Sequence, residues 1–425
     1  MCHKYAKHFF SWLLFLISGF PVLAQNSNKE NIPYTRYGIG DLQTGANVLA
    51  RGMGYQTAAL ASPYAVNTEN PASYASLKLT TYELGVAGGM RTLSSNGNDY
   101  RTGTVSLAYL NIGIPVGKHA GLNIGLKPQS RVYYRLQEDT LIQGLGDNSY
   151  VYSGDGGLNY AFLGIAGTYG GLSLGVNAGY MFGTVRNSSV LQQSGNDIML
   201  SSEFSRYSKT GGLYWSSGAL YETALTRDLK LRVGGTLTLA QTLNVWRDEY
   251  WINFRTLSGV IDRDTTLNTA DQKGTVRLPM SGSIGAQVLG NDVWSAGVDV
   301  ALTQWSQYRS FGMPDSVADQ SLRLGVGGAY TPDATSRYNY LQRITYRLGF
   351  YYGKDYVRLR QTDIYYYAVT VGASLPFRRS PDRVHAAFEL GRRGTEANGL
   401  VLENFYRLSL GISLNDRWFI KRKYD

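Results

Sequence analysis

The feature that most constrains the fold is a period-two alternation of apolar with small or polar residues, which begins at Tyr82 and recurs along most of the remaining chain. Successive side chains of a β-strand point to opposite faces, so each such stretch predicts a strand with one apolar face. The clearest stretches lie at 229–239, 276–288, 294–303, 384–391 and 406–413.

Such strands suit either a soluble sandwich, with the apolar faces inward, or a transmembrane barrel, with the apolar faces toward lipid. The connections favour the barrel because short turns alternate with long polar loops, and 332–342 is the one long connection on the short-turn side. The short turns are 117–119, 169–170, 227–228, 290–291 and 378–382. The long loops are 93–100, 137–153, 187–205, 247–274, 310–320, 354–362 and 393–404.

The predicted fold class is therefore all-β, a transmembrane antiparallel β-barrel of about 14 strands. Composition agrees, with 33 Tyr and 50 Gly, and with a mean hydropathy of −0.22. Past the N-terminus no apolar run approaches the roughly 20 residues of a spanning helix. Aromatic residues cluster where strands would cross the membrane interfaces, as girdle residues do, at 133–134, 246–251, 351–352 and 365–367.

The N-terminus predicts an export signal over residues 1–24. Lys4 and Lys7 precede an apolar run at 9–22, and Val22-Leu23-Ala24 predicts cleavage before Gln25. We expect the outer membrane of a Gram-negative bacterium as the destination. Cleavage would remove Cys2, the only cysteine, and would lower the formal net charge from +10 by the two lysines to +8.

Residues 25–78 differ in composition from the rest of the chain. They contain Gly-punctuated turns and small residues, with too little apolar bulk for a core of their own. We expect them to form a hatch in the lumen of a barrel built from residues 79–425. Asn70-Pro71-Ala72 lies where this segment passes into the first strand, as a hinge or simply as a rigid turn.

Little in the sequence indicates chemistry. Two histidines, His119 and His385, follow the predicted signal, and neither has an acidic partner nearby in the sequence. We predict no catalytic residues, no metal site, no cofactor and no enzymatic activity. Arg51-Gly52-Met53-Gly54 lacks the lysine of a phosphate loop, and positive charge spread along the chain does not predict nucleic-acid binding.

The third predicted strand contains Lys127-Pro128-Gln129-Ser130-Arg131 between two apolar alternating stretches. A proline inside a barrel wall removes one ladder hydrogen bond and bends the strand. The bend predicts either a lateral gate formed by Lys127, Pro128 and Arg131, or a strand end beyond the membrane. Pro279 interrupts a later strand in the same way.

Together these features resemble the FadL/TodX family of outer-membrane transporters for long-chain fatty acids and other hydrophobic compounds. The resemblance rests on Ala50 to Gly54, Ser62 to Ala65, Asn70-Pro71-Ala72 and the proline of the third strand. It implies a fourteen-stranded barrel closed by an N-terminal hatch that includes Arg51, Gly52 and Gly54. It also implies lateral exit of the ligand through a kink in the third strand.

Two functions remain open at this stage. The first is passive uptake of hydrophobic or amphipathic small molecules, with Lys127, Arg131 or Arg51 steering an acidic headgroup. The second is a barrel subunit of an outer-membrane secretion or assembly machine, sealed by its hatch. The expected partners are outer-membrane lipid, a hydrophobic ligand or outer-membrane proteins, and the basic tail Lys421 to Lys423 could contact either lipid or protein.

Overall fold

The computed structural model describes residues 31–95, 97–142, 146–193, 201–257, 260–291 and 293–418. Eighteen strands form one antiparallel sheet that closes on itself where the last strand pairs with the first strand of the wall. The predicted export signal and the tail at 421–423 lie outside the described residues.

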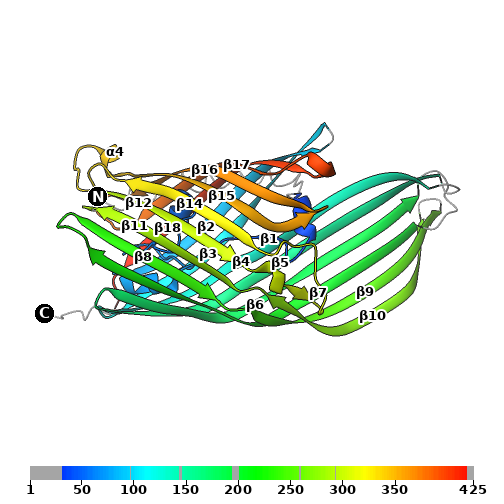
Figure 1. Ribbon diagram of the computed structural model, residues 1–425, viewed down its shortest axis with the longest axis horizontal. Helices are drawn as coiled ribbons and strands as arrows, with labels where there is room; N and C mark the ends of the chain where they lie inside the picture. Colours follow the sequence, from blue (N-terminus) through cyan, green and yellow to red (C-terminus); the bar gives the residue numbers. More distant parts are fainter. Residues whose placement is uncertain are drawn as a thin grey trace.

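The wall begins with six long strands (Figure 1), which are β2 (Thr80–Ser95), β3 (Asn98–Val116), β4 (Ala120–Ile142), β5 (Gly146–Tyr169), β6 (Leu172–Gln193) and β7 (Ser201–Ala224). Four strands follow, which are β8 (Leu229–Thr238), β9 (Gln241–Leu257), β10 (Val260–Leu278) and β11 (Ser281–Gly290). The wall ends with β12 (Trp294–Thr303), β14 (Ser321–Tyr330), β15 (Thr345–Leu359), β16 (Thr362–Pro376), β17 (Arg383–Gly394) and β18 (Leu402–Asp416).

This wall is a barrel of fourteen strands, as predicted. β7 pairs with both β8 and β9, so these two are halves of one barrel strand. β10 and β11 are likewise halves of the next, because they pair with β9 and β8 respectively. The strands β1 (Asp41–Leu42) and β13 (Arg309–Ser310) lie outside the ring of fourteen. Among the described residues, no helix is long and apolar enough to span a membrane.

The strands differ greatly in length. β4 to β7 contain 22 to 24 residues each, whereas β12 and β14 contain only 10. Figure 1 shows β5, β6, β7, β9 and β10 continuing well past the other strands at one end. Several segments predicted as long polar loops are therefore strands. The prediction was wrong for most of 137–153, 187–205 and 247–274, because a strand beyond the hydrocarbon has no face that must be apolar.

Two prolines mark irregularities in the wall. Pro279 separates β10 from β11, opposite the break between β8 and β9. In β4 the register with β5 shifts between Pro128 and Ser130, which leaves Gln129 as an extra residue. A bulge accommodates the missing N–H of proline, and it also bends the strand.

Residues 31–78 form a largely buried N-terminal segment. It contains η1 (Pro33–Arg36), β1, α3 (Val48–Arg51) and η2 (Pro71–Ser76). In Figure 1 its blue trace runs between the barrel walls, and its backbone or side chains bond to β4, β7, β16, β17 and β18. Because it touches strands all round the barrel, the segment occupies the lumen.

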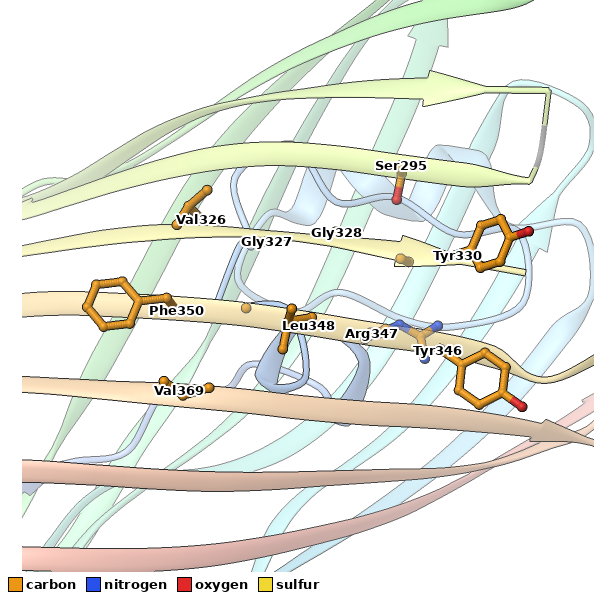
Figure 2. Close-up of a pocket in the computed structure, with 12 residues that line it drawn as sticks. Ser295, Val326, Gly327, Gly328, Tyr330, Tyr346, Arg347, Leu348, Phe350 and Val369 are labelled. Atoms are coloured by element: carbon orange, nitrogen blue, oxygen red, sulfur yellow. The ribbon is translucent and has the colours of Figure 1, made fainter. Parts of the chain in front are cut away.

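The outer face of the wall is apolar and exposed, as lipid contact requires. A shallow hollow of about 600 Å³ lies on this face over β12, β14, β15 and β16 (Figure 2). Exposed side chains of Val326, Tyr330, Leu348 and Phe350 surround it. The hollow belongs to the lipid-facing surface and is separate from the lumen.

Candidate functional site: the barrel lumen

The predicted hatch residues at 51–54 pack the N-terminal segment against the wall. Buried Arg51 donates from Nε to the Ala46 carbonyl at 2.9 Å and from Nη1 to Ser409 Oγ at 3.3 Å. Gly54 has a positive φ of 68°, and its N–H donates to Thr370 Oγ1 at 3.0 Å. A Cβ at Gly54 would lie 2.6 Å from carbonyl oxygens of β14 and β15, so only glycine fits there.

Asn70, Pro71 and Ala72 lie near the C-terminal end of the segment, at the start of η2. The Asn70 Oδ1 caps η2 by accepting from Ala72 N at 3.1 Å, with Pro71 in the first turn. The Asn70 Nδ2 donates to the carbonyls of Ala58 at 2.5 Å and of Ala219 in β7 at 3.1 Å. Asn70 therefore joins two parts of the segment to the wall.

Lys127 and Arg131 contact different partners. Lys127 Nζ lies 2.6 Å from Glu69 Oε1 of the N-terminal segment, and Arg131 Nη2 donates to the Leu107 carbonyl of β3 at 3.0 Å. The backbone pairing between β3 and β4 runs from Val116–Ala120 to Leu110–Leu126. Among the described residues it does not continue into 98–109 of β3 and 127–139 of β4.

The N-terminal segment pairs instead with this part of β4. Asp41 lies opposite Arg131 and Leu42 opposite Ser130, so β1 adds a short antiparallel strand to β4. Ile32 N also donates to the Tyr133 carbonyl at 2.8 Å, and Gln43 N to the Gln129 carbonyl at 3.0 Å. The edge of β4 that β3 leaves is thus bonded by the segment.

Asp41 also holds this segment to the other side of the barrel. Its carboxylate lies 2.9 Å from Arg393 Nη1 in β17 and 3.7 Å from Arg91 Nη2 in β2. Arg393 Nε lies 2.7 Å from Asp355, and Arg91 Nη1 lies 2.7 Å from Glu403. The buried charges of β2, β15, β17, β18 and the segment therefore form one network.

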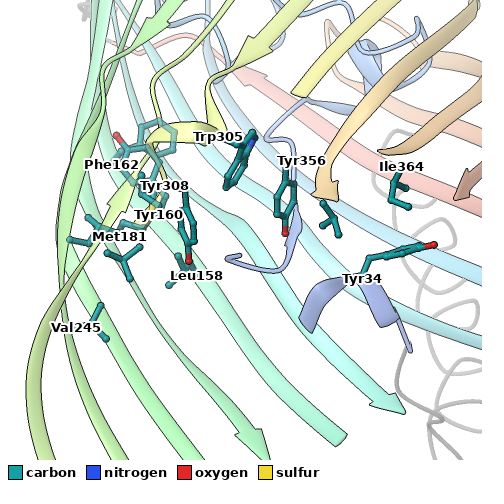
Figure 3. Packing of buried hydrophobic residues seen from close by; sticks show 14 of the residues in the cluster. Tyr34, Leu158, Tyr160, Phe162, Met181, Val245, Trp305, Tyr308, Tyr356 and Ile364 are labelled. Carbon is teal, nitrogen blue, oxygen red and sulfur yellow. The ribbon is translucent and has the colours of Figure 1, made fainter. Parts of the chain in front are cut away.

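An aromatic cluster lies inside the barrel against the long strands (Figure 3), and its Tyr34 ring centre lies 5.3 Å from the guanidinium carbon of Arg393. Trp305 of η3 (Trp305–Gln307) stacks on Tyr356 with ring centroids 4.2 Å apart. The Tyr356 hydroxyl bonds the Tyr37 carbonyl at 3.0 Å and also the Gly40 carbonyl. Tyr34 of η1 completes the cluster, and its hydroxyl donates to the Val401 carbonyl at 2.5 Å.

Next to this cluster lies a lumenal cavity of about 330 Å³, which Tyr160 and Tyr356 of the cluster help to line. One wall carries hydroxyls from β7, β8, β11, β12 and β14, and the other carries cations and tyrosines. The lining cations are Arg51, Arg91, Lys127, Arg323, Lys354, Arg393 and Arg407, whereas the lining acids are Asp41, Glu69 and Asp355. The cavity is therefore polar, with more cations than acids.

His385 lies in a hydrogen-bonded row across five adjacent strands near the end with short turns. Arg347 donates to Ser374 Oγ at 2.5 Å, and Ser374 Oγ lies 2.6 Å from His385 Nδ1. His385 Nε2 lies 3.0 Å from Ser413 Oγ, which donates to Glu83 at 2.6 Å. This row assigns the proton to Nε2. Ser374 has no exposed surface, so the row stabilises the wall and presents no nucleophile to a substrate.

Within the described part of the chain, no group of three or more His, Cys, Asp or Glu residues could hold a metal ion. His119 lies exposed in the turn after β3, as expected. The residues that sequence reasoning missed are Asp41, Glu69, Arg323 and Arg393. Arg323 and Arg393 lie at inward positions of alternating strands, so a search for charges on the polar faces would have found them.

A closed barrel of fourteen antiparallel strands, apolar outside and polar inside, defines an integral β-barrel of the outer-membrane type. The chain belongs to the BamG family, whose model matches residues 6–425. No curated protein matches the sequence.

Solved structures show the same fold at low identity. A Pseudomonas aeruginosa FadL homologue is 13% identical with a TM-score of 0.57, covering 88% of this chain and 100% of its own. The Pseudomonas putida toluene transporter TodX is 16% identical with a TM-score of 0.55, covering 90% and 100%. The Ralstonia pickettii toluene transporter TbuX is 14% identical with a TM-score of 0.56, covering 87% and 98%.

Proposed function

We propose that this protein is a non-enzymatic outer-membrane channel for passive uptake of hydrophobic or amphipathic small molecules. In this proposal residues 1–24 direct export and residues 25–78 are the hatch. Arg51, Gly52 and Gly54 dock the hatch on the wall, and Asn70, Pro71 and Ala72 are its hinge. Lys127, Pro128 and Arg131 flank a lateral opening between β3 and β4.

The observation that carries the proposal is the end of β3–β4 pairing at Leu110–Leu126. In a closed barrel every backbone group is bonded to a neighbouring strand, because an unpaired group in hydrocarbon costs several kcal/mol. Here two adjacent strands part, and the N-terminal segment bonds the edge of β4 instead, through the two-residue strand β1 and single hydrogen bonds from Ile32 and Gln43. A two-residue strand with a few flanking hydrogen bonds is easier to displace than a full ladder.

The position of this parting supports the same function. The pairing of β3 with β4 ends at Leu126, one residue before Lys127-Pro128. The bulge in β4 also bends the strand at this place. TodX and TbuX are toluene transporters, and their barrels share this fold. A lateral exit would pass an apolar molecule directly into the membrane without a step through water.

The test is to lock β1 onto β4 with a disulfide. Leu42 and Ser130 lie directly opposite each other, so Leu42→Cys with Ser130→Cys, in a Cys2→Ser background, joins the two strands. Labelled oleate and toluene are supplied to a Gram-negative host that lacks its own channel of this kind. We expect the oxidised variant to lose uptake and the reduced variant to recover it.

A matched pair controls for the disulfide itself. Leu348 and Val371 are opposite each other on the exposed face of β15 and β16, which are paired along their length. Leu348→Cys with Val371→Cys should leave uptake unchanged in both redox states. Equal uptake by the oxidised and reduced β1–β4 variant, with the disulfide shown by mass spectrometry, would refute the lateral exit.

A second function, a subunit of an outer-membrane machine, is favoured by the edge of β10. Among the described residues, 263–274 of β10 pair with β9 alone. An unpaired edge is a template for a strand of another protein. The stretch 265–270 carries no charge, and exposed Asp264 and Asp271 flank it. We propose that a partner in this case adds a strand there.

A photo-crosslinking amino acid at Leu267 tests this second function in intact cells, with the exposed Met313 as a control position. The expected result is one adduct with a different outer-membrane protein at Leu267 only, and its loss when Thr266→Pro is added. Adducts of equal yield at both positions, or an adduct with a second copy of the chain, would count against the partner.

A further inference from the structure

We propose that the lumenal cavity binds an acidic, hydroxyl-rich group, such as a sugar acid or a glycerol phosphate. This inference rests on the proposed uptake function, because it names the chemical class that the lumen accepts. The observations that carry it are a ladder of hydroxyls along one wall and one lining cation, Arg323, that has neither a hydrogen bond nor an ion pair among the described residues.

The hydroxyl ladder crosses four neighbouring strands. In the sheet register Ser321 of β14 pairs with Thr303 of β12, Thr303 pairs with Ser281 of β11, and Ser281 pairs with Thr238 of β8. All four line the cavity. Adjacent strands lie roughly 4.8 Å apart, so the wall offers hydroxyls at a regular spacing.

A second row of lining residues lies beside the first. Arg323 pairs with Ala301, Ala301 with Ser283, and Ser283 with Thr236. Thr236 Oγ1 and Ser283 Oγ are 2.7 Å apart. The small side chains of this row leave a recess in the wall, and Arg323 is the last residue of the row. The two rows therefore combine a recess, a hydroxyl surface and a guanidinium.

Arg323 differs from every other cation of the cavity. Arg51, Arg91, Lys127, Lys354, Arg393 and Arg407 each have a hydrogen bond or an ion pair at 3.5 Å or less. Within the described residues Arg323 has neither, and its guanidinium carbon lies 5.6 Å from the centre of the Tyr55 ring. A half-buried guanidinium with free donors is the group that an acidic ligand would satisfy.

The acids that act on Arg323 electrostatically, Asp299 and Glu69, are already bonded elsewhere. Asp299 Oδ2 accepts from Thr57 N at 3.0 Å and from Ala58 N at 2.7 Å. Glu69 is paired with Lys127 at 2.6 Å. Asp299 Oδ2 and Glu69 Oε1 are thus engaged by these donors, and among the described residues neither acid forms an ion pair with Arg323.

These features select the chemistry of the ligand. A carboxylate or phosphate can bond two donors of a guanidinium at once, and ligand hydroxyls can both donate to and accept from the Ser and Thr ladder. A purely apolar occupant would remove water from Arg323 and from the hydroxyls without replacing their hydrogen bonds. Of the two classes named in the proposed uptake function, the cavity thus favours amphipathic molecules with an acidic, hydroxyl-rich group over pure hydrocarbons.

The ligand could be a free sugar acid or the headgroup of an amphiphile. Leu42 of β1 and Lys127 and Gln129 of β4 also line the cavity, so it reaches the place where β3 and β4 part. If an amphiphile places its headgroup in the cavity, its acyl chain can therefore lie near that edge of β4. The two sources share one headgroup chemistry, and soluble probes can separate them.

The test measures binding to the purified full-length barrel by isothermal titration calorimetry. The probes are glucuronate, glucose, acetate, glycerol 3-phosphate and dihexanoylphosphatidylglycerol below its micelle concentration. We expect glucuronate or glycerol 3-phosphate to bind at least ten-fold more tightly than glucose or acetate, since each of these two lacks half of the recognised chemistry. If only the phosphatidylglycerol binds, the source is a lipid headgroup.

Variants assign the binding to the site. Arg323→Gln should weaken the bound probe at least ten-fold, and Arg323→Lys should weaken it less, because it retains the charge but not the fork of donors. Thr303→Val should weaken glucuronate and leave acetate unaffected. Exposed Arg277 does not line the cavity, so Arg277→Gln is the matched control. Unchanged affinity in Arg323→Gln, or no binding of any probe, would overturn the inference.

The outcome is separable from that of the uptake function. Probe binding is measured on the purified barrel without the engineered disulfide, and lock-sensitive uptake is measured in cells with the Leu42→Cys, Ser130→Cys variant. Binding without lock-sensitive uptake would refute the channel and keep the site. Lock-sensitive uptake of oleate without binding of any acidic probe would refute the site and keep the channel.

Discussion

At the scale of residues, polar side chains on the inner face of the wall form rows of hydrogen bonds from strand to strand. His385 is the clearest case, since its two ring nitrogens connect Ser374 and Ser413 on the strands to either side. His385 lies on the buried face of the alternating stretch 384–391. The sequence could not identify its partners, because Ser374 and Glu83 are far from it along the chain and meet it only through strand register.

His385→Leu should therefore destabilise the barrel. The substitution removes one hydrogen bond from each of the buried Ser374 and Ser413 hydroxyls, at a cost of about 1–3 kcal/mol. Urea unfolding in detergent, followed by tryptophan fluorescence, measures the change. His119→Leu, in an exposed turn, is the control and should change the stability by less than about 0.5 kcal/mol. Equal effects of the two substitutions would show that the row contributes nothing.

Gly349 tests how closely the N-terminal segment approaches the wall. A Cβ at this position would collide with the backbone of Met53 and Gly54, so Gly349→Ala should displace the segment and cost about 1–3 kcal/mol. Gly235→Ala is the matched control, since its Cβ would meet nothing closer than 3.5 Å. Limited proteolysis within 31–78 should accelerate for Gly349→Ala and stay unchanged for Gly235→Ala.

At the scale of elements, the alternating strands and the short turns were predictable, and the ends of the long strands were not. Alternation identifies a strand only where one face meets lipid, so β5 to β7 and β10 lost their signal beyond the membrane. The proline in β4 correctly indicated an irregular place in the wall. That β1 would bond this place was not predictable, because a two-residue strand has no periodicity.

Hydrogen exchange should distinguish β3 and β4 from fully paired strands. Amides at 103–109 of β3 lack β4 as a partner on one side, whereas β16 is paired with β15 on one side and β17 on the other. We expect faster exchange at 103–109 than at 366–374, because a local opening there breaks fewer bonds. Equal protection of the two stretches, measured by mass spectrometry in detergent, would contradict this expectation.

At the scale of the whole molecule, the N-terminal segment and the wall are coupled through Asp41. Its carboxylate faces both Arg393 and Arg91, while β1 bonds β4. Asp41→Asn should loosen the segment but not the wall, since Arg393 keeps Asp355 at 2.7 Å. The expected result is several-fold faster proteolysis within 31–78 with little change in the unfolding temperature. A large fall in that temperature would mean that the segment and the wall unfold together.

The pairing of β18 with β2 has a consequence for how the molecule is made. This seam joins the first and last strands of the wall, so the ring exists only after the whole chain has been supplied. The N-terminal segment precedes β2 and ends up surrounded by strands that follow it. Threading it afterwards would require pulling Tyr34, Tyr55 and Tyr74 through a completed ring. The segment must instead take its place against the sheet while the sheet is still open. During biogenesis the strands therefore surround the N-terminal segment before β18 pairs with β2.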